Sequence, residues 1–234
     1  MISVVIPTKN ESFFLPELLA SLKKQKILMQ IIVADAFSTD GTVKIARRFG
    51  AKVVDGGMPS VGRNNGAKTA KGDILVFLDA DVILPDGFLK KNIDEFKRRN
   101  LDFATTFVKP RSERLDDRWI HKLWNIVYLI LARFSPFGCG FHIIVKKDIW
   151  DKTRFDASVV LGEDFDFTTR ASKAGARFGV LRSVPILVSV RRLDKEGRLG
   201  FILKVIGAYI HTILKGPVRT DLFKYELGNH KPKA

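Results

Sequence analysis

The sequence has little of what zinc sites and disulfides require. It holds one cysteine, Cys139, and four histidines among 234 residues. A single cysteine excludes a disulfide within the chain and fits a reducing compartment. No group of His and Cys has the spacing of a zinc site. There is also no GxxxxGK[ST] pattern, so a P-loop is excluded, and the spacings support no Ser–His–Asp arrangement.

Long apolar runs are missing as well. No window reaches the roughly 18 uninterrupted apolar residues of a membrane-spanning helix. The opening MISVVIPTKNE has no basic segment followed by a long apolar core, so no signal peptide is expected. We therefore expect a cytoplasmic protein, either free or lying on the cytoplasmic face of a membrane.

Acidic residues are outnumbered. The net charge is +15, and residues 170–234 alone hold fourteen Lys or Arg against four Asp or Glu. Such a surface favours a polyanion, an anionic membrane or a phosphorylated substrate. The alternative is a basic solvated surface that serves solubility alone.

Strand and helix patterns alternate through the first hundred residues. Strands are expected at 2–7, 30–35, 51–55 and 73–81, and helices at 15–25, 38–50, 60–72 and 86–100. This order predicts a mainly parallel sheet covered by helices on both faces. Further on, helices are expected at 116–134 and 199–216, a strand within 136–150, a loop entering a helix at 162–175, and one or two strands within 179–193.

The stretch ILVFLDADVILPDG, residues 74–87, places two aspartates at the end of a buried strand. If the strand persists through both, Asp79 and Asp81 project on the same side. Two neighbouring carboxylates suit Mg²⁺ or Mn²⁺, which a substrate diphosphate would complete. The alternative is a solvated turn in which Asp81 caps the backbone.

Other polar residues follow neighbouring strands at the same predicted edge, where open α/β sheets bind ligands. They are residues 7–11, Asp35, Asp79 and Asp81. Arg63 and Lys9 suit phosphate oxygens, although each could equally be an exposed surface cation. Glu163 and Asp164 either cap a helix, which their position favours, or supply a general base.

Five segments together resemble glycosyltransferase family 2, inverting nucleotide-sugar-dependent transferases with the GT-A fold. They are VVIPTKNE (4–11), VADAFSTDGT (33–42), GRNNGAKTAKGDILVFLDADV (62–82), GCGFHIIVKKDIWDKTRFD (138–156) and GEDFDFTTRASKAG (162–175). Their order and spacing both agree. The resemblance covers residues 1–192, the expected GT-A domain, and leaves 193–234 as a basic amphipathic helical extension.

The resemblance implies a role for each matching residue. Asp164 is the expected catalytic base, supported by Glu163, and Asp81 is the expected ligand of a divalent cation, Mg²⁺ or Mn²⁺. The implied nucleotide-binding residues are Pro7, Thr8, Glu11, Asp35, Arg63, Asp79 and Ala80. The loop Gly138–Gly140 would line the acceptor side, and the residues assigned to phosphate or acceptor are Lys9, Gly140, Arg191 and Arg192.

The chain departs from the family pattern in two places. Many members read D-D-G-S where this chain reads Asp35-Ala36-Phe37-Ser38, which affects base selectivity. Many also carry a metal-ligand histidine where this chain reads VSVRRLD. Either the metal is held more loosely here, or Arg191 and Arg192 take part of the phosphate-neutralising task.

The resulting hypothesis is sugar transfer from a UDP- or GDP-sugar to a hydroxyl or phosphate acceptor. Apolar faces at 199–216 and 119–134 suggest an anionic membrane and a lipid-linked acceptor, or else packing onto the core or within a homodimer. Nucleic acid is not expected as a partner. Two alternatives remain at this point: nucleotidyl transfer, and a non-enzymatic module that binds anions or nucleic acid.

Overall fold

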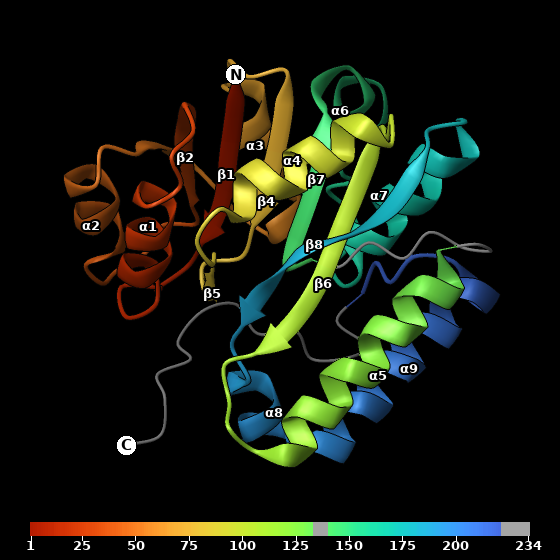
Figure 1. The fold of residues 1–234 in the computed structure, drawn as a ribbon. Coiled ribbons are helices and arrows are strands. Elements are labelled where there is room, and N and C mark those ends of the chain that lie inside the picture. The colour runs from red at the N-terminus through yellow and green to blue at the C-terminus, as the bar shows by residue number, and fades with distance from the viewer. Residues whose placement is uncertain (133–139, 221–234) are drawn as a thin grey trace.

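A computed structural model describes residues 1–132 and 140–220, in which helices flank a central eight-stranded sheet (Figure 1). The strands are β1 Ile2–Thr8, β2 Met29–Asp35, β3 Lys52–Asp55, β4 Ile74–Leu78, β5 Val82–Ile83, β6 Phe103–Pro110, β7 His142–Lys146 and β8 Phe178–Val188. The helices are α1 Leu15–Lys23, α2 Thr42–Arg48, α3 Pro59–Lys68, α4 Phe88–Arg98, α5 Leu115–Leu131, α6 Lys147–Thr153, α7 Glu163–Lys173, α8 Arg191–Glu196 and α9 Arg198–Lys215.

The sheet is mixed, with a parallel half formed by the expected βα units. Its order is β3-β2-β1-β4-β7-β6-β8-β5. Strands β3, β2, β1 and β4 are parallel neighbours, and β6 is parallel to β8. Strand β7 runs antiparallel between β4 and β6, and β5 is antiparallel to β8. The predicted mixed, mainly parallel α/β architecture is confirmed.

Two apolar layers bury the two faces of the sheet. Because successive side chains of a strand point to opposite faces, Val4 and Ile6 of β1 join one core while Val5 joins the other. The first core is completed by α1, α2 and α4, and the second by α3, α6 and α7. The carboxyl ends of β1, β2 and β4 therefore meet at one edge, which is the lower edge of the sheet in Figure 1.

Strand β4 ends earlier than the sequence pattern predicts. It stops at Leu78, and Asp79 to Asp81 form a turn leading into β5. The assumption that one strand carries both carboxylates is therefore wrong. Strands β5 and β6 and the short helices α6 and α8 were not expected. Strand β5 and the two helices are too short for a periodic pattern, and β6, FATTFVKP, does not alternate regularly between apolar and polar residues.

Two glycines let α3 approach the sheet closely. A Cβ on Gly66 would lie 2.3 Å from Val5 Cγ1, and one on Gly62 would lie 3.2 Å from Pro7 Cβ. These residues weaken α3 as an isolated helix. In return, they bring the helix and its Arg63 close to the end of β1.

Helices α5 and α9 contribute little to the two cores, the exception being Tyr128 of α5, which joins the first core. No residue of α9 is buried, and α5 buries only Asp117 and Tyr128. Within the residues described here, none of the helices is long and apolar enough to cross a membrane. The division at residue 192 stays a prediction, and Gly138, Cys139 and residues 221–234 lie outside the described residues.

We expect Gly66→Ala to lower the free energy of unfolding by about 1–3 kcal/mol, the usual cost of overpacking a core. The new methyl group would collide with the stiff β-branched side chain of Val5. Urea denaturation followed by circular dichroism measures the change. The matched control is Gly200→Ala in α9, where no atom lies within 4 Å of the added Cβ. An equal loss in both variants would contradict close helix–sheet contact at Gly66.

Candidate active site

The loop after β1 and the end of β2 are joined through Asp35. Thr8 Oγ1 donates to Asp35 Oδ1 at 3.1 Å, and the Ser38 amide and hydroxyl donate to the same carboxylate at 2.8 and 2.6 Å. Pro7 lies opposite Ala34 in the β1–β2 pairing. The four residues predicted from the first two segments, Pro7, Thr8, Glu11 and Asp35, are thus brought to one edge, with Asp35 buried.

Lys9 is committed to the backbone in this structure. Its ammonium donates to the carbonyl oxygens of Ala36 and Phe37, both at 2.7 Å. These bonds fix the loop after β2 in the region where the chain departs from the D-D-G-S pattern. A phosphate role for Lys9 stays a prediction, because a ligand would have to compete with both carbonyls.

Arg63 is the buried centre of the site. Its guanidinium pairs with Glu163 of α7, donates to Asp79 Oδ1 at 3.1 Å and donates to the Gly140 carbonyl at 3.1 Å. Only 2% of the Arg63 side chain is exposed. Burial acts to lower the pKa of Arg63, but the negative charges of Glu163 and Asp79 raise it by more. The net effect is a raised pKa, so Arg63 stays charged. One cation therefore ties together α3, the turn after β4 and the start of α7.

Asp164 lies beside this cluster, and its carboxylate has a raised pKa. Burial raises the pKa of Asp164 to about 7, with the negative charge of Glu163 adding to the rise and Arg63 opposing it. Its Oδ1 accepts a hydrogen bond from the Phe165 amide at 2.9 Å. A Cβ on Gly140 would lie 3.2 Å from Asp164 Oδ2, so any side chain there would crowd this carboxylate.

A second cation, Arg191, closes the other side of the site. Its Nη1 and Nη2 donate to the two carboxylate oxygens of Glu11, both at 2.9 Å. Its Nε lies 2.9 Å from Asp81 Oδ2. Burial raises the pKa of Glu11 and Arg191 opposes the rise. The positive charge of the neighbouring Arg192 lowers the pKa of both Glu11 and Asp79.

The predicted metal site does not match this geometry. Asp79 pairs with Arg63, Asp81 lies against Arg191, and the buried Ala80 separates them in the turn. Burial raises the pKa of Asp79 to about 6, Arg63 opposes the rise and Asp81 adds to it. Among residues 1–132 and 140–220, no group of three or more His, Cys, Asp or Glu side chains is arranged to hold a metal ion. The residues that would hold the cation are already paired with guanidinium groups.

Three supporting residues were not foreseen. Phe155 places its ring 5.6 Å from the guanidinium carbon of Arg63, and Asn64 holds the Phe155 backbone through bonds of 2.7 and 3.1 Å. Phe14 lies 4.7 Å from the guanidinium carbon of Arg191. An aromatic ring under an arginine leaves no spacing signal, because the partners are distant in the sequence. Asn64 adjoins Arg63 within the segment 62–82, but its residue type alone does not indicate a role.

Two other features lie outside this cluster. His142 is buried with its ring 5.2 Å from Phe88, and burial lowers its pKa to about 3, so it is a neutral core residue.

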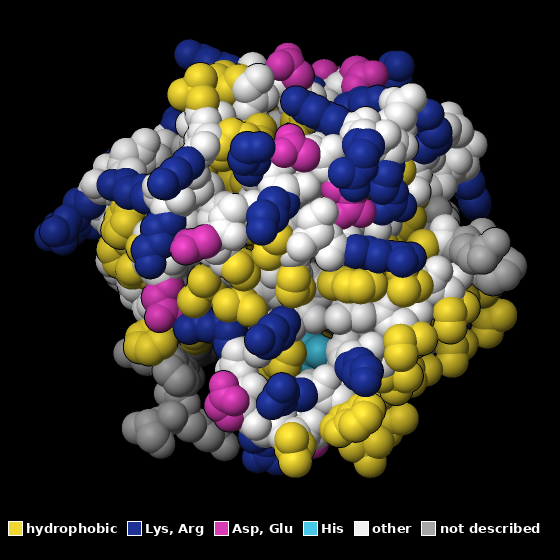
Figure 2. All heavy atoms as spheres, in the orientation of Figure 1, with side chains coloured by type: hydrophobic (Ala, Val, Ile, Leu, Met, Phe, Trp, Pro, Cys, Tyr) yellow, Lys and Arg dark blue, Asp and Glu magenta, His cyan; other side chains and the backbone are white. Residues whose placement is uncertain are grey.

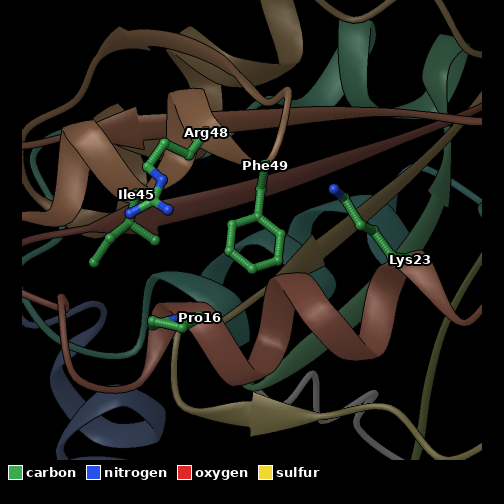
Figure 3. A pocket seen from close by; sticks show the side chains of 5 residues that line it. All are labelled: Pro16, Lys23, Ile45, Arg48 and Phe49. Atoms are coloured by element: carbon green, nitrogen blue, oxygen red, sulfur yellow. The ribbon is translucent and has the colours of Figure 1, made fainter.

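A hollow of about 340 Å³ lies between α1 and α2, lined by Pro16, Lys23, Ile45, Arg48 and Phe49 (Figure 3). No residue predicted for the site lines it.

Comparison with known proteins shows the family to which the chain belongs. Residues 3–149 match the model of glycosyl transferase family 2, which is more than half of the chain. The chain therefore belongs to glycosyl transferase family 2, as its five segments suggested. It is 44% identical over 92 residues to the 4,4'-diaponeurosporenoate glycosyltransferase of Staphylococcus haemolyticus, a match covering 36% of this chain and 24% of that protein.

Solved structures share the GT-A fold. Staphylococcus aureus TarS with UDP has a TM-score of 0.64 at 22% identity, covering 90% of this chain and 65% of the other. The mannosyltransferase PcManGT from Pyrobaculum calidifontis, with GDP-Man and Mn²⁺, has a TM-score of 0.68 at 20% identity, covering 88% and 64%. The chain spans less than two thirds of each of these three proteins.

We expect Arg63→Met to lower the free energy of unfolding by about 3–5 kcal/mol, because removing one partner leaves a buried carboxylate uncompensated. Urea denaturation measures the loss. Arg177→Met is the control, since Arg177 is 53% exposed and pairs with Asp102 at the surface, where a pair contributes less than about 1 kcal/mol. Similar losses in the two variants would mean that Arg63 does not hold the site together.

Proposed function

We propose that this chain transfers a sugar from a nucleoside-diphosphate sugar to an acceptor hydroxyl with inversion at the anomeric carbon. The observation that carries the proposal is the meeting of Arg63, Asp79, Glu163 and Asp164 at the carboxyl edge of the sheet. Family membership supports sugar transfer over the nucleotidyl-transfer and anion-binding alternatives.

The donor would lie along the edge formed by β1, β2 and β4. Asp35 and the loop after β1 would contact the nucleoside, and Asp79 the ribose. As the bond to the sugar breaks, negative charge develops on the diphosphate, and fixed guanidinium groups stabilise such charge. UDP in TarS and GDP-Man in the mannosyltransferase make a UDP- or GDP-sugar the expected donor class.

Asp164 would act as the general base. It would take the proton of the acceptor hydroxyl while the hydroxyl oxygen attacks the anomeric carbon of the sugar, from the side opposite the leaving nucleoside diphosphate. A base works best when its pKa is close to the working pH, and the pKa of Asp164 is raised to about 7. Glu163 would support it through its pair with Arg63, and Gly140 would leave the acceptor room beside it.

The divalent cation stays a prediction for this chain. The mannosyltransferase structure contains Mn²⁺. Here the Asp79 and Asp81 carboxylates are each paired with an arginine. No step of the proposed reaction is therefore assigned to a metal.

We expect Asp164→Asn to lower kcat by about 100-fold or more, the usual contribution of a general base, with little change in the affinity for the donor. Because the base works in its deprotonated form, wild-type kcat/KM should rise with pH through about 7. Thermal-shift screening against nucleoside-diphosphate sugars selects the donor, and initial rates then measure the loss.

Asp148→Asn is the matched control. Asp148 also lies in the first turn of a helix, α6, but it is exposed. Helix α6 follows β7, which runs antiparallel to β4, so Asp148 lies at the opposite edge of the sheet. The Asp148→Asn variant should keep the wild-type kcat. An Asp164→Asn variant that keeps more than about a tenth of the wild-type rate would remove Asp164 from the role of base.

The acceptor side carries an exposed apolar surface over α5 and α9, which we call the α5–α9 surface. It contains Leu115, Trp119, Leu123, Ile126, Val127, Ile130, Leu199, Leu203, Ile206, Ile210, Ile213 and Leu214. Figure 2 shows hydrophobic side chains gathered over this corner of the molecule. Helix α9 has no fully buried residue, although its Tyr209 contacts Phe165, so packing onto the core or within a homodimer stays the alternative.

Helix α9 lies next to the proposed base. Its Tyr209 ring is 5.2 Å from the ring of Phe165, the residue that follows Asp164. Arg198 at its start pairs with Asp117 of α5 at 3.0 Å, and Val218 beyond its end pairs with Leu161 just before α7. An acceptor held at the α5–α9 surface would thus be close to Asp164.

A lipid surface is the occupant that fits this patch best. Helix α9 contains three basic residues and no acidic ones, and the whole chain carries a net charge of +15. Anionic lipids attract such a helix while its apolar side chains enter the bilayer surface. The proposed acceptor is therefore a lipid or lipid-linked sugar, reached from the membrane surface.

We expect the wild-type protein to float with anionic phosphatidylglycerol vesicles, and a Leu203→Glu/Ile206→Glu variant to stay at the bottom of the gradient. Both side chains are exposed, so the variant should melt at the wild-type temperature. The control is Leu28→Glu, which is 78% exposed but lies between α1 and β2. Wild-type protein that never floats, or that runs as a dimer through this surface in gel filtration, would contradict the membrane proposal.

A further inference from the structure

Arg191 holds three distant parts of the chain at one point of the site. It is the first residue of α8, it binds Glu11 in the loop after β1, and it lies against Asp81 in the turn after β4. Glu11 and Arg191 are 180 residues apart in the sequence. The side chain is only 13% exposed. The Arg191 guanidinium is therefore held in one position inside the site and is not a mobile surface group.

The contacts leave little choice of orientation for this guanidinium. Its two terminal nitrogens match the two oxygens of Glu11, and Phe14 lies against it at 4.7 Å. A guanidinium has five N–H groups in a rigid fork. The Glu11 pair uses two of them and Asp81 faces Nε, so each terminal nitrogen keeps one N–H for another acceptor.

One of the two acids that Arg191 contacts is the residue expected to bind the cation. Asp81 is the carboxylate assigned to a metal by the resemblance, and Glu11 lies on the opposite side of the same guanidinium. In addition, the charge of Arg192 reaches Glu11 and Asp79. Arg191 and Arg192 together carry two positive charges, which equals the charge of one divalent ion.

We propose that Arg191, with Arg192 beside it, takes the place of the divalent cation, so that this chain binds the diphosphate of its donor without a metal. The inference rests on the proposed function, because it concerns the same nucleotide. Arg191 would donate its remaining N–H groups to diphosphate oxygens, as arginine forks do. Glu11, Asp81 and Phe14 would hold the fork in position.

The test is calorimetric titration of the full chain with UDP and with GDP, in EDTA and in excess Mn²⁺. At least one nucleotide should bind, with an affinity that differs by less than about tenfold between the two conditions. Binding only in Mn²⁺ would overturn the inference and leave the proposed function standing. No binding of either nucleotide in either condition would overturn both.

Variants of Arg191 sharpen the result. Arg191→Gln should weaken nucleotide binding in EDTA by about tenfold to hundredfold, the value of a charge-assisted hydrogen bond. It also frees two carboxylates, so electron paramagnetic resonance should detect Mn²⁺ bound to this variant and none bound to wild type. Unchanged affinity in EDTA, or Mn²⁺ bound equally by both proteins, would contradict the inference.

Two further variants serve as controls. Arg191→Lys keeps the charge and loses the fork, so it should fall between wild type and Arg191→Gln in EDTA; it also decides the question if Arg191→Gln does not fold. Lys195→Gln changes a basic, exposed residue of the same helix and should bind as wild type does. A loss at Lys195 equal to the loss at Arg191 would show that general charge, not the fork, is responsible.

Discussion

The site depends on one buried cation. Arg63 joins α3, the turn after β4, the loop at Gly140 and the start of α7. Carboxylates drawn out of water are costly unless they are paired and hydrogen-bonded. A guanidinium that pairs Asp79 and Glu163 meets that requirement at the centre of the edge. Beside it, burial and the negative charge of Glu163 raise the pKa of Asp164.

Arg191 repeats the arrangement on the other side of the edge. Both arginines have an aromatic ring near the guanidinium, Phe155 for Arg63 and Phe14 for Arg191, and both pair with a glutamate. Six carboxylates lie at this edge, those of Glu11, Asp35, Asp79, Asp81, Glu163 and Asp164. Arg63 and Arg191 pair with four of them, and the charge of Arg192 acts on Glu11 and Asp79. The acids hold the arginines in fixed positions, so that their charges are already oriented when a diphosphate arrives. Such preorganisation is what makes electrostatic stabilisation effective.

Much of this arrangement follows from the sequence, and the reason is topological. Alternating strands and helices force parallel pairing, so Asp35 and Asp79 had to reach the same edge. The pattern could not show that β4 stops at Leu78, because the apolar run continues past Asp79 and only pairing with β7 determines where the strand ends. It also could not show α8, since six residues are too few for a helical period. The pairing of Arg191 with Glu11 spans nearly the whole chain and leaves no local signal. The α5–α9 surface was visible as periodicity, but only the fold shows that α9 buries none of its residues.

The central claim is that a nucleoside diphosphate binds along the edge where Arg63 and Arg191 are fixed. The most direct measurement is a crystal structure of the chain with the nucleotide selected by thermal shift. The account predicts a diphosphate within hydrogen-bonding distance of Arg191 and a nucleoside beside Asp35. A nucleotide found instead in the hollow between α1 and α2, with the arginine edge empty, would contradict it.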